Sequence, residues 1–167
     1  MFNGIIFNQG IVQNIEKRLK GINIFVISDL KLTKKDIGVS VSCDGVCLTL
    51  ITISRNVMEF YLSDETIQRS KFKFLKVKDK INLELPLKYG QKISGHICQG
   101  HIDTVGKISN IKKRLFNDFY LFKSPKSLSK LVVYKDFNFF KDLTQKYKNK
   151  NKINTKLGKD IITLYNK

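Results

Sequence analysis

The sequence predicts an all-β protein made of two tandem six-stranded, Greek-key-like β-barrels with short helices, the second barrel being incomplete. Three observations lead to this prediction. Asp44 and Gly45 separate two alternating segments, a pattern typical of a tight β-hairpin. Further short apolar segments follow at the spacing expected of a small closed barrel. The second half of the chain then begins as a copy of the first.

The predicted hairpin begins at Gly38 and has two different faces. Apolar and small polar side chains alternate on both sides of the turn, so that one face belongs to the core. The apolar face carries Val39, Val41, Cys43, Val46, Leu48 and Leu50. The opposite face carries Ser40, Ser42, Cys47 and Thr49. This second face is either ordinary surface or the floor of a ligand site, and the pattern leaves both interpretations open.

The other segments of the first half can be assigned in order. Residues 2–15 predict a strand, a bend relieved by glycine and a second strand. A β segment from Val57 follows the hairpin after a polar break. The remaining assignments are a charged turn at 16–21, a strand at 22–27, a polar loop at 31–36, a helical turn at 65–70, a turn at 76–80 and a strand at 81–85.

A shift of 96 residues brings the second half of the chain into register with the first. It places Gly4 on Gly100 and Gly10 on Gly106, with matching apolar residues beyond them. A second Asp-Gly turn is then expected near residue 140, where the sequence has none. Matching Thr66 to Thr144 instead needs a shift of 78, which implies about 18 missing residues (96 − 78). We therefore expect one barrel over residues 1–93 and a second, truncated barrel over 94–167.

Composition narrows the classes of function. A formal net charge of +17 would suit a nucleic-acid-binding protein. The lysines are spread along the whole chain, however, and only four residues are arginines, so we expect no nucleic-acid partner. A basic barrel that binds nucleic acid on one face remains an alternative. Three cysteines without paired spacing favour neither a disulfide framework nor a metal site.

The chain has no uninterrupted apolar run of membrane-spanning length. Its first residues lack the basic region and cleavage pattern of a signal peptide. A cytoplasmic protein without a membrane partner is therefore expected.

Four motifs, in order along the chain, carry a family resemblance. They are Met-Phe-Asn-Gly-Ile-Ile at 1–6, Ser-Val-Ser-Cys-Asp-Gly-Val-Cys-Leu-Thr at 40–49, Glu-Thr at 65–66 with Ser70, and Gly-His-Ile-Cys-Gln-Gly-His-Ile-Asp at 95–103. In this order and spacing they resemble the motifs of riboflavin synthases, which are trimers of subunits with two similar lumazine-binding barrels. The resemblance covers residues 1 to about 135.

The resemblance implies an activity and its partners. Riboflavin synthases catalyse a dismutation in which two molecules of 6,7-dimethyl-8-ribityllumazine exchange a four-carbon unit, giving riboflavin and a pyrimidinedione. The reaction uses no metal and no redox cofactor. It requires loss of a proton from the 7-methyl group of one substrate and attack of a nucleophile at C7 of the other. A homotrimer is implied, with lumazine synthase as a further partner.

The same resemblance implies site residues. His96 and His101 are candidate proton carriers because imidazole titrates near neutrality. Ser40 and Cys47 are candidate nucleophiles or orienting groups. The implied substrate contacts are Gly4, Ile5, Ile6, Cys47, Leu48, Thr49, Tyr61, Leu62, Ser63, Asp64, Glu65, Thr66, Gly100, His101, Ile102 and Lys135.

The sequence departs from the family pattern in its second half. After Asp136 it lacks the Asp-Gly hairpin, the Ser-Leu-Thr and the distal acidic residue that the second barrel of the family contributes. The first barrel would then bind one lumazine while the second substrate lacks its usual place, which would remove up to roughly 7–11 kcal/mol of positional advantage. A non-catalytic lumazine or flavin binder, or an inactive truncated homologue, is therefore the alternative to an enzyme.

Overall fold

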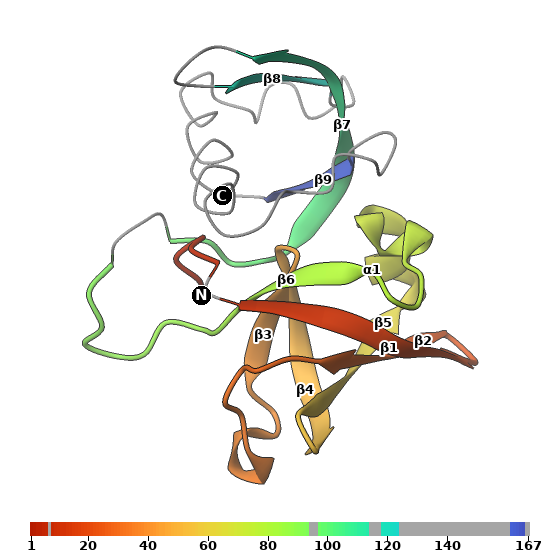
Figure 1. The fold of residues 1–167 in the computed structure, drawn as a ribbon, viewed down its shortest axis with the longest axis vertical. Helices are drawn as coiled ribbons and strands as arrows, with labels where there is room; N and C mark the ends of the chain where they lie inside the picture. The colour runs from red at the N-terminus through yellow and green to blue at the C-terminus, as the bar shows by residue number, and fades with distance from the viewer. Residues whose placement is uncertain (7, 94–96, 114–117, 124–160, 166–167) are drawn as a thin grey trace.

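The computed structural model describes residues 1–6, 8–93, 97–113, 118–123 and 161–165. Within them, six antiparallel strands form a closed barrel in the order β1-β2-β5-β4-β3-β6 (Figure 1). Their bounds are β1 Asn8–Arg18, β2 Gly21–Ile27, β3 Ser40–Cys43, β4 Val46–Ser54, β5 Val57–Ser63 and β6 Lys80–Glu84. The all-β class and the six-stranded first barrel predicted from the sequence are confirmed.

Short helical segments connect the strands. The helix α1, Asp64–Arg69, follows β5 directly and leads into the 3₁₀ turn η2, Lys71–Phe74. A second 3₁₀ turn, η1 at Lys34–Asp36, lies in the predicted polar loop, where Thr33 and Asp36 cap it reciprocally. The predicted charged turn at 16–21 is too long, because β1 continues to Arg18 and pairs with β2 up to Gly21.

The hairpin has the predicted turn and register. Asp44 and Gly45 both have positive φ, 48° and 91°, as a two-residue hairpin turn with the twist of the flanking strands requires. Ser40 lies opposite Thr49 and Ser42 opposite Cys47, so the four small polar residues share the outer face of the barrel. The apolar partners point inward, and Val41, Cys43, Val46, Leu48 and Leu50 are buried.

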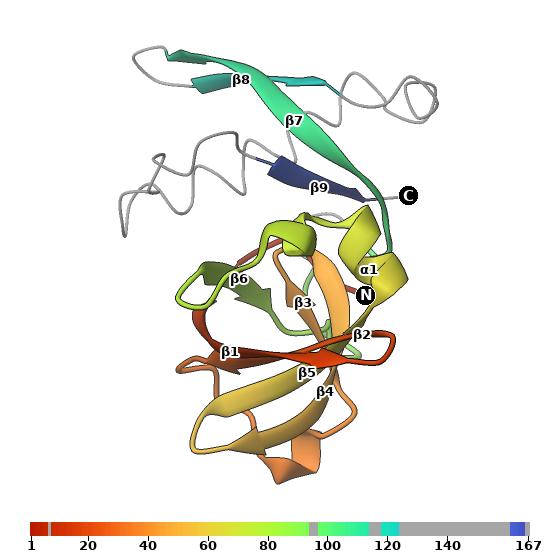
Figure 2. The same cartoon turned by 90° about the vertical axis from the view of Figure 1, so that its right-hand side faces the viewer.

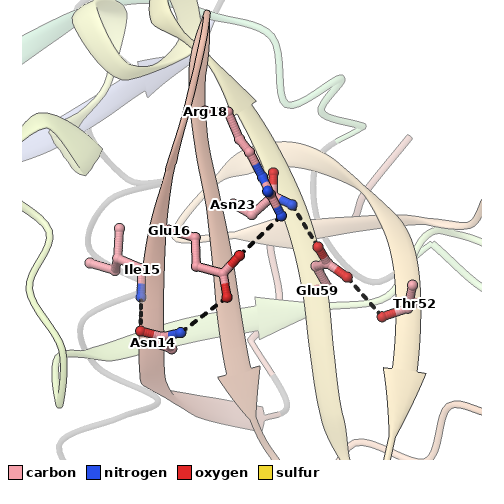
Figure 3. A network of polar contacts seen from close by, with 7 residues as sticks. All are labelled: Asn14, Ile15, Glu16, Arg18, Asn23, Thr52 and Glu59. Atoms are coloured by element: carbon pink, nitrogen blue, oxygen red, sulfur yellow. Dashed lines mark hydrogen bonds and ion pairs between the residues drawn. The ribbon is translucent and has the colours of Figure 1, made fainter.

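The core fills the barrel interior. Its largest side chains without solvent exposure are supplied by β2, β4, β5 and β6, and include Ile24, Leu50, Met58, Phe60, Leu62 and Leu83. On the outside, Glu59 of β5 accepts hydrogen bonds from Asn23 of β2 (2.6 Å) and Thr52 of β4 (3.0 Å). Figure 3 shows this polar outer face, with Asn14, Glu16 and Arg18 of β1 beside it.

A second sheet follows the barrel. It consists of β7 Ile102–Lys113, β8 Asp118–Lys123 and β9 Ile161–Tyr165, with β7 in the middle. Figures 1 and 2 both place this sheet beyond the end of the barrel that carries α1. None of the helices in the described part of the chain is long and apolar enough to cross a membrane.

The pairing of the second sheet repeats that of the barrel. Ile24 pairs with Ile15 in the barrel, and Tyr120 pairs with Ile111 in the sheet, each displaced by 96. The irregularity between Val12 and Asn14 recurs between 108 and 110. The internal repeat inferred from glycine positions therefore extends to strand register.

Strand β9 corresponds to β6 of the barrel, but at a shift smaller than 96 residues. Gly10 pairs with Ile81 of β6, and Gly106 pairs with Ile162 of β9, so the last strands are related by 81 residues. The chain between β8 and β9, residues 124–160, is thus 15 residues shorter than its counterpart, residues 28–79 (52 − 37). The expected absence of a second Asp-Gly hairpin concerns residues outside the described part of the chain.

Replacing Phe60 by Ala should test the barrel core. Phe60 has no solvent exposure, and we expect a loss of about 3–5 kcal/mol in the free energy of unfolding because a large cavity forms. Phe74→Ala is the matched control: this ring is 54% exposed, and its loss should change stability by less than about 1 kcal/mol. Urea titrations of both variants measure this, and equal effects would show that the barrel interior is wrongly assigned.

Candidate functional site

Two segments contact the outer face of the barrel at β4 and β6. One is the opening of the chain, residues 1–6, and the other is residues 97–101, which precede β7. They pair with each other at Phe2 and Cys98, which exchange two backbone hydrogen bonds of 2.7 and 2.9 Å. Because Phe2 and Cys98 are related by the repeat shift of 96, the two halves of the chain meet through equivalent residues.

The second half of the chain is also joined to the hairpin. The N–H of Cys47 donates to the carbonyl of Gly100 at 2.9 Å. A Cβ atom at Gly100 would lie 2.9 Å from Cys47 Cβ and 3.2 Å from a ring carbon of Phe2, and the residue has φ +80°. Glycine is therefore required at the point where the two halves touch.

Strands β4 and β5 separate next to this contact. They are paired from Ser54 and Val57 up to Leu50 and Phe60 and diverge beyond. The bond to Gly100 shows that the Cys47 N–H points away from β3 and towards this split. Since backbone direction alternates along a strand, the N–H and C=O of Thr49 also point away from β3. The pairing of Leu50 with Phe60 engages the C=O of Thr49 with β5, which leaves the N–H of Thr49 at the strand edge that borders the split.

The far side of the split is built by β5 and α1. The Ser63 hydroxyl caps α1 by accepting the N–H of Thr66 at 3.2 Å, and the two hydroxyl oxygens lie 3.0 Å apart. Tyr61 donates its hydroxyl to the carbonyl of Lys20 in the β1–β2 turn. The helix contacts β7, and Ile102 at the start of β7 packs against the barrel core.

Two carboxylates fix the framework of the site. Asp44 is joined to Asn82 of β6 by two hydrogen bonds of 2.8 Å and to Lys71 of η2 by a 2.7 Å ion pair, with its side chain only 4% exposed. It therefore ties the hairpin turn to β6 and to the segment after α1. Glu84, at the end of β6, accepts the N–H of Asn3 at 2.6 Å and so holds the opening segment.

Burial governs the thiols around the site. It raises the pKa of the Cys43 thiol well above its usual value, and neighbouring Asp44 and Cys47 add to this. Burial, followed by the charge of Glu84, also raises the pKa of Cys98. Both groups are therefore neutral thiols at physiological pH, poorly suited to act as nucleophiles. No group of three metal-binding side chains occurs among the residues described.

The first half of the chain matches the model of a known family. Residues 3–86 match the lumazine binding domain. Riboflavin synthase of Buchnera aphidicola subsp. Schizaphis graminum is 36% identical over 141 residues, which are 82% of this chain and 67% of that protein. The chain belongs to the riboflavin synthase family. Riboflavin synthase of Escherichia coli is 32% identical over 139 residues, covering 82% of this chain and 65% of that protein.

Solved structures agree with this membership of the riboflavin synthase family. LumP complexed with riboflavin superposes with a TM-score of 0.66 at 26% identity, covering 80% of this chain and 72% of that one. LumP complexed with 6,7-dimethyl-8-(1'-D-ribityl) lumazine gives a TM-score of 0.61 at 25% identity, with 80% and 71% covered. The matches span about two thirds of the length of the riboflavin synthases named above.

Most residues implied by the riboflavin synthase resemblance lie around the split. The structure brings together three of the predicted segments, residues 47–49, 61–66 and 100–102, and the Phe2–Cys98 pair brings residues 4–6 to the same side of the barrel. Leu48 and Leu62 are buried in the core, so only their backbone is available to a ligand. His96 and Lys135 lie outside the described residues.

The candidate side chains differ in surroundings. His101 is exposed, Cys47 and Ser40 are half-buried, and Ser40 faces Thr49 across the hairpin. Glu65 forms an exposed ion pair with Arg69 at 2.9 Å. Sequence reasoning missed Glu84 and Lys71, because their partners lie far away in the chain. The outward position of Glu84 at the end of an alternating strand was the only available signal.

Gly100→Ala should weaken the contact between the two halves of the chain. The added Cβ meets the backbone and side chain of Cys47, so we expect a loss of more than about 2 kcal/mol in unfolding free energy. Gly90→Ala is the control, since Gly90 has φ +75° but no atom within 4 Å of the added Cβ, and only the backbone cost of about 1–2 kcal/mol applies. Thermal or urea unfolding compares the two; a Gly100 variant no worse than the Gly90 variant would contradict the contact.

Proposed function

We propose that this chain binds 6,7-dimethyl-8-ribityllumazine at the split between β4 and β5 and acts as a riboflavin synthase. The observation that carries the proposal is the convergence of residues 47–49, 61–66 and 100–102 around the split, where the N–H of Thr49 lies at the edge of β4. A lumazine is flat, and its polar groups lie on its edge. Strand-edge N–H and C=O groups can pair with such an edge in its own plane.

In the proposed reaction, the first barrel holds one lumazine and orients it. His101, exposed beside Gly100, is the proton carrier that the described residues offer for the 7-methyl group. Cys47 and Ser40 orient the ligand from the hairpin or supply the nucleophile that adds at C7 of the other lumazine. Much of the acceleration comes from holding the two substrates face to face.

The second substrate requires another site. In the family that the sequence resembles, each catalytic site pairs the first barrel of one subunit with the second barrel of its neighbour. We therefore propose that activity depends on assembly of copies of this chain, as a trimer. We propose the cytoplasm as the location of this assembly.

The activity is tested by mixing purified protein with the lumazine and recording riboflavin formation by absorbance, alongside the oligomeric state by light scattering. We expect saturable lumazine binding together with riboflavin production by the assembled form. Saturable binding without any riboflavin would identify a binding-only protein and exclude the enzyme. Absence of binding by folded protein would contradict the whole proposal.

Two substitutions test the placement of the site. Cys47→Ser and His101→Ala should each weaken lumazine affinity or slow turnover by roughly 3- to 10-fold, the worth of about one polar contact. Lys34→Ala in η1 is the control, being an exposed cation in a different loop of the barrel, and should change neither quantity. Fluorescence titration and initial rates measure the effects, and equal effects at all three positions would mean that the site is misplaced.

A further inference from the structure

Glu84 is a buried carboxylate that the proposed reaction does not use. It lies at the end of β6 on the outer face of the barrel, opposite Ser42 of β3, and is only 3% exposed. Its Oε1 accepts the N–H of Asn3 at 2.6 Å, a length typical of a strong bond to a charged acceptor. Asn3 is itself buried, so this bond is shielded from water.

Three successive backbone N–H groups act on this carboxylate. Burial raises the pKa of Glu84, and the N–H groups of Asn3, Ile5 and Gly4 oppose that shift. Gly4 has φ +72°, which turns the chain so that consecutive amides face one side. Such an arrangement of consecutive N–H groups forms a concave anion site, here occupied by a side chain of the same protein.

The held segment runs directly into the proposed ligand contacts. Residues 4–6 are implied contacts, and Glu84 binds the N–H of Asn3, directly before them. Across the sheet, Glu84 faces Ser42, Ser42 faces Cys47, and Cys47 donates to Gly100. One row of residues on the outer face therefore joins the opening segment to the hairpin edge and to the second half of the chain.

The second half of the chain differs at this position. Gly4 corresponds to Gly100 by the shift of 96, and Glu84 corresponds to position 165 by the shift of 81 that relates β6 to β9. Position 165 is a tyrosine, which has no carboxylate. The carboxylate is thus a feature of the first half alone.

We propose that Glu84 is a positioning residue of the lumazine site, which holds the backbone of Asn3–Ile5 in the conformation that places residues 4–6 against the ligand. This inference rests on the proposed function. Glu84 acts through the backbone of the opening segment. What positions this segment is a hydrogen-bond acceptor oxygen at a fixed distance from β6.

Three variants separate position from charge. Glu84→Gln keeps an acceptor oxygen at the same reach, Glu84→Asp keeps the charge but withdraws it by one methylene, and Glu84→Ala removes the acceptor. We expect lumazine affinity to fall in the order wild type, Gln, Asp, Ala, with a loss of at least tenfold for Ala. Glu59→Ala is the control: Glu59 is also an outer-face carboxylate, but it lies on β5 and accepts its hydrogen bonds from the side chains of Asn23 and Thr52, so this variant should bind lumazine as the wild type does.

Hydrogen exchange of the amides of residues 3–5 supplies a second readout. It should accelerate in the Asp and Ala variants and remain slow in the Gln variant, whether or not lumazine is present. If the Ala variant does not fold, the Gln and Asp variants still decide the matter. Equal lumazine affinity in all variants, or retained affinity in Asp with loss in Gln, would overturn the role of Glu84. Failure of the wild type itself to bind lumazine would instead show that the proposed function is wrong.

Discussion

The reciprocal backbone pairing of Phe2 with Cys98 is the constraint on which the rest of the structure depends. It brings the opening of each half of the chain together and places residues 97–101 over the outer face of the first barrel. From there Gly100 reaches the N–H of Cys47, and β7 begins beside α1. Phe2 and Cys98 are equivalent residues of the repeat, so this one pairing fixes the opening segment of both halves of the chain.

The site exists because two neighbouring barrel strands, β4 and β5, diverge. The strands β4 and β5 pair from Leu50 to Ser54 with one irregularity between Leu50 and Thr52, but near the hairpin β4 follows β3 while β5 continues along β2. On this side of β4, the pairing with β5 ends at the C=O of Thr49. The Cys47 N–H is bound by Gly100, and the N–H of Thr49 lies at an edge suited to a flat, edge-polar ligand. Asp44 and Lys71 keep the two sides of the split in fixed positions, since a buried carboxylate must remain paired.

Much of the fold and part of the site could be predicted, because they depend on residues close together in the sequence. Asp44 and Gly45 specified the turn, alternation specified which hairpin face is core, and the spacing of Gly4 and Gly10 revealed the repeat. These features are local because turn geometry and two-residue periodicity act over a few residues. The family motifs then located residues 47–49, 61–66 and 100–102, which the fold brings together.

The rest could not be found because it depends on distant pairing. Glu84 and Asn3 are 81 residues apart, and Lys71 meets Asp44 only because α1 and η2 fold back over the hairpin. The register of β9 was equally hidden, since its residues share little with those of β6 and only the pairing with β7 aligns them. The predicted turn at residues 16–21 is too long because charged residues occur at an exposed strand end as readily as in a turn.

The central claim is that a lumazine lies along the split between β4 and β5. The most direct measurement is a set of nuclear Overhauser contacts between the ring methyl groups of bound 6,7-dimethyl-8-ribityllumazine and the backbone amides of an isotope-labelled chain. Contacts to Thr49 and to Tyr61–Ser63 are expected. Contacts confined to the outer face around Asn23, Thr52 and Glu59 would contradict the account.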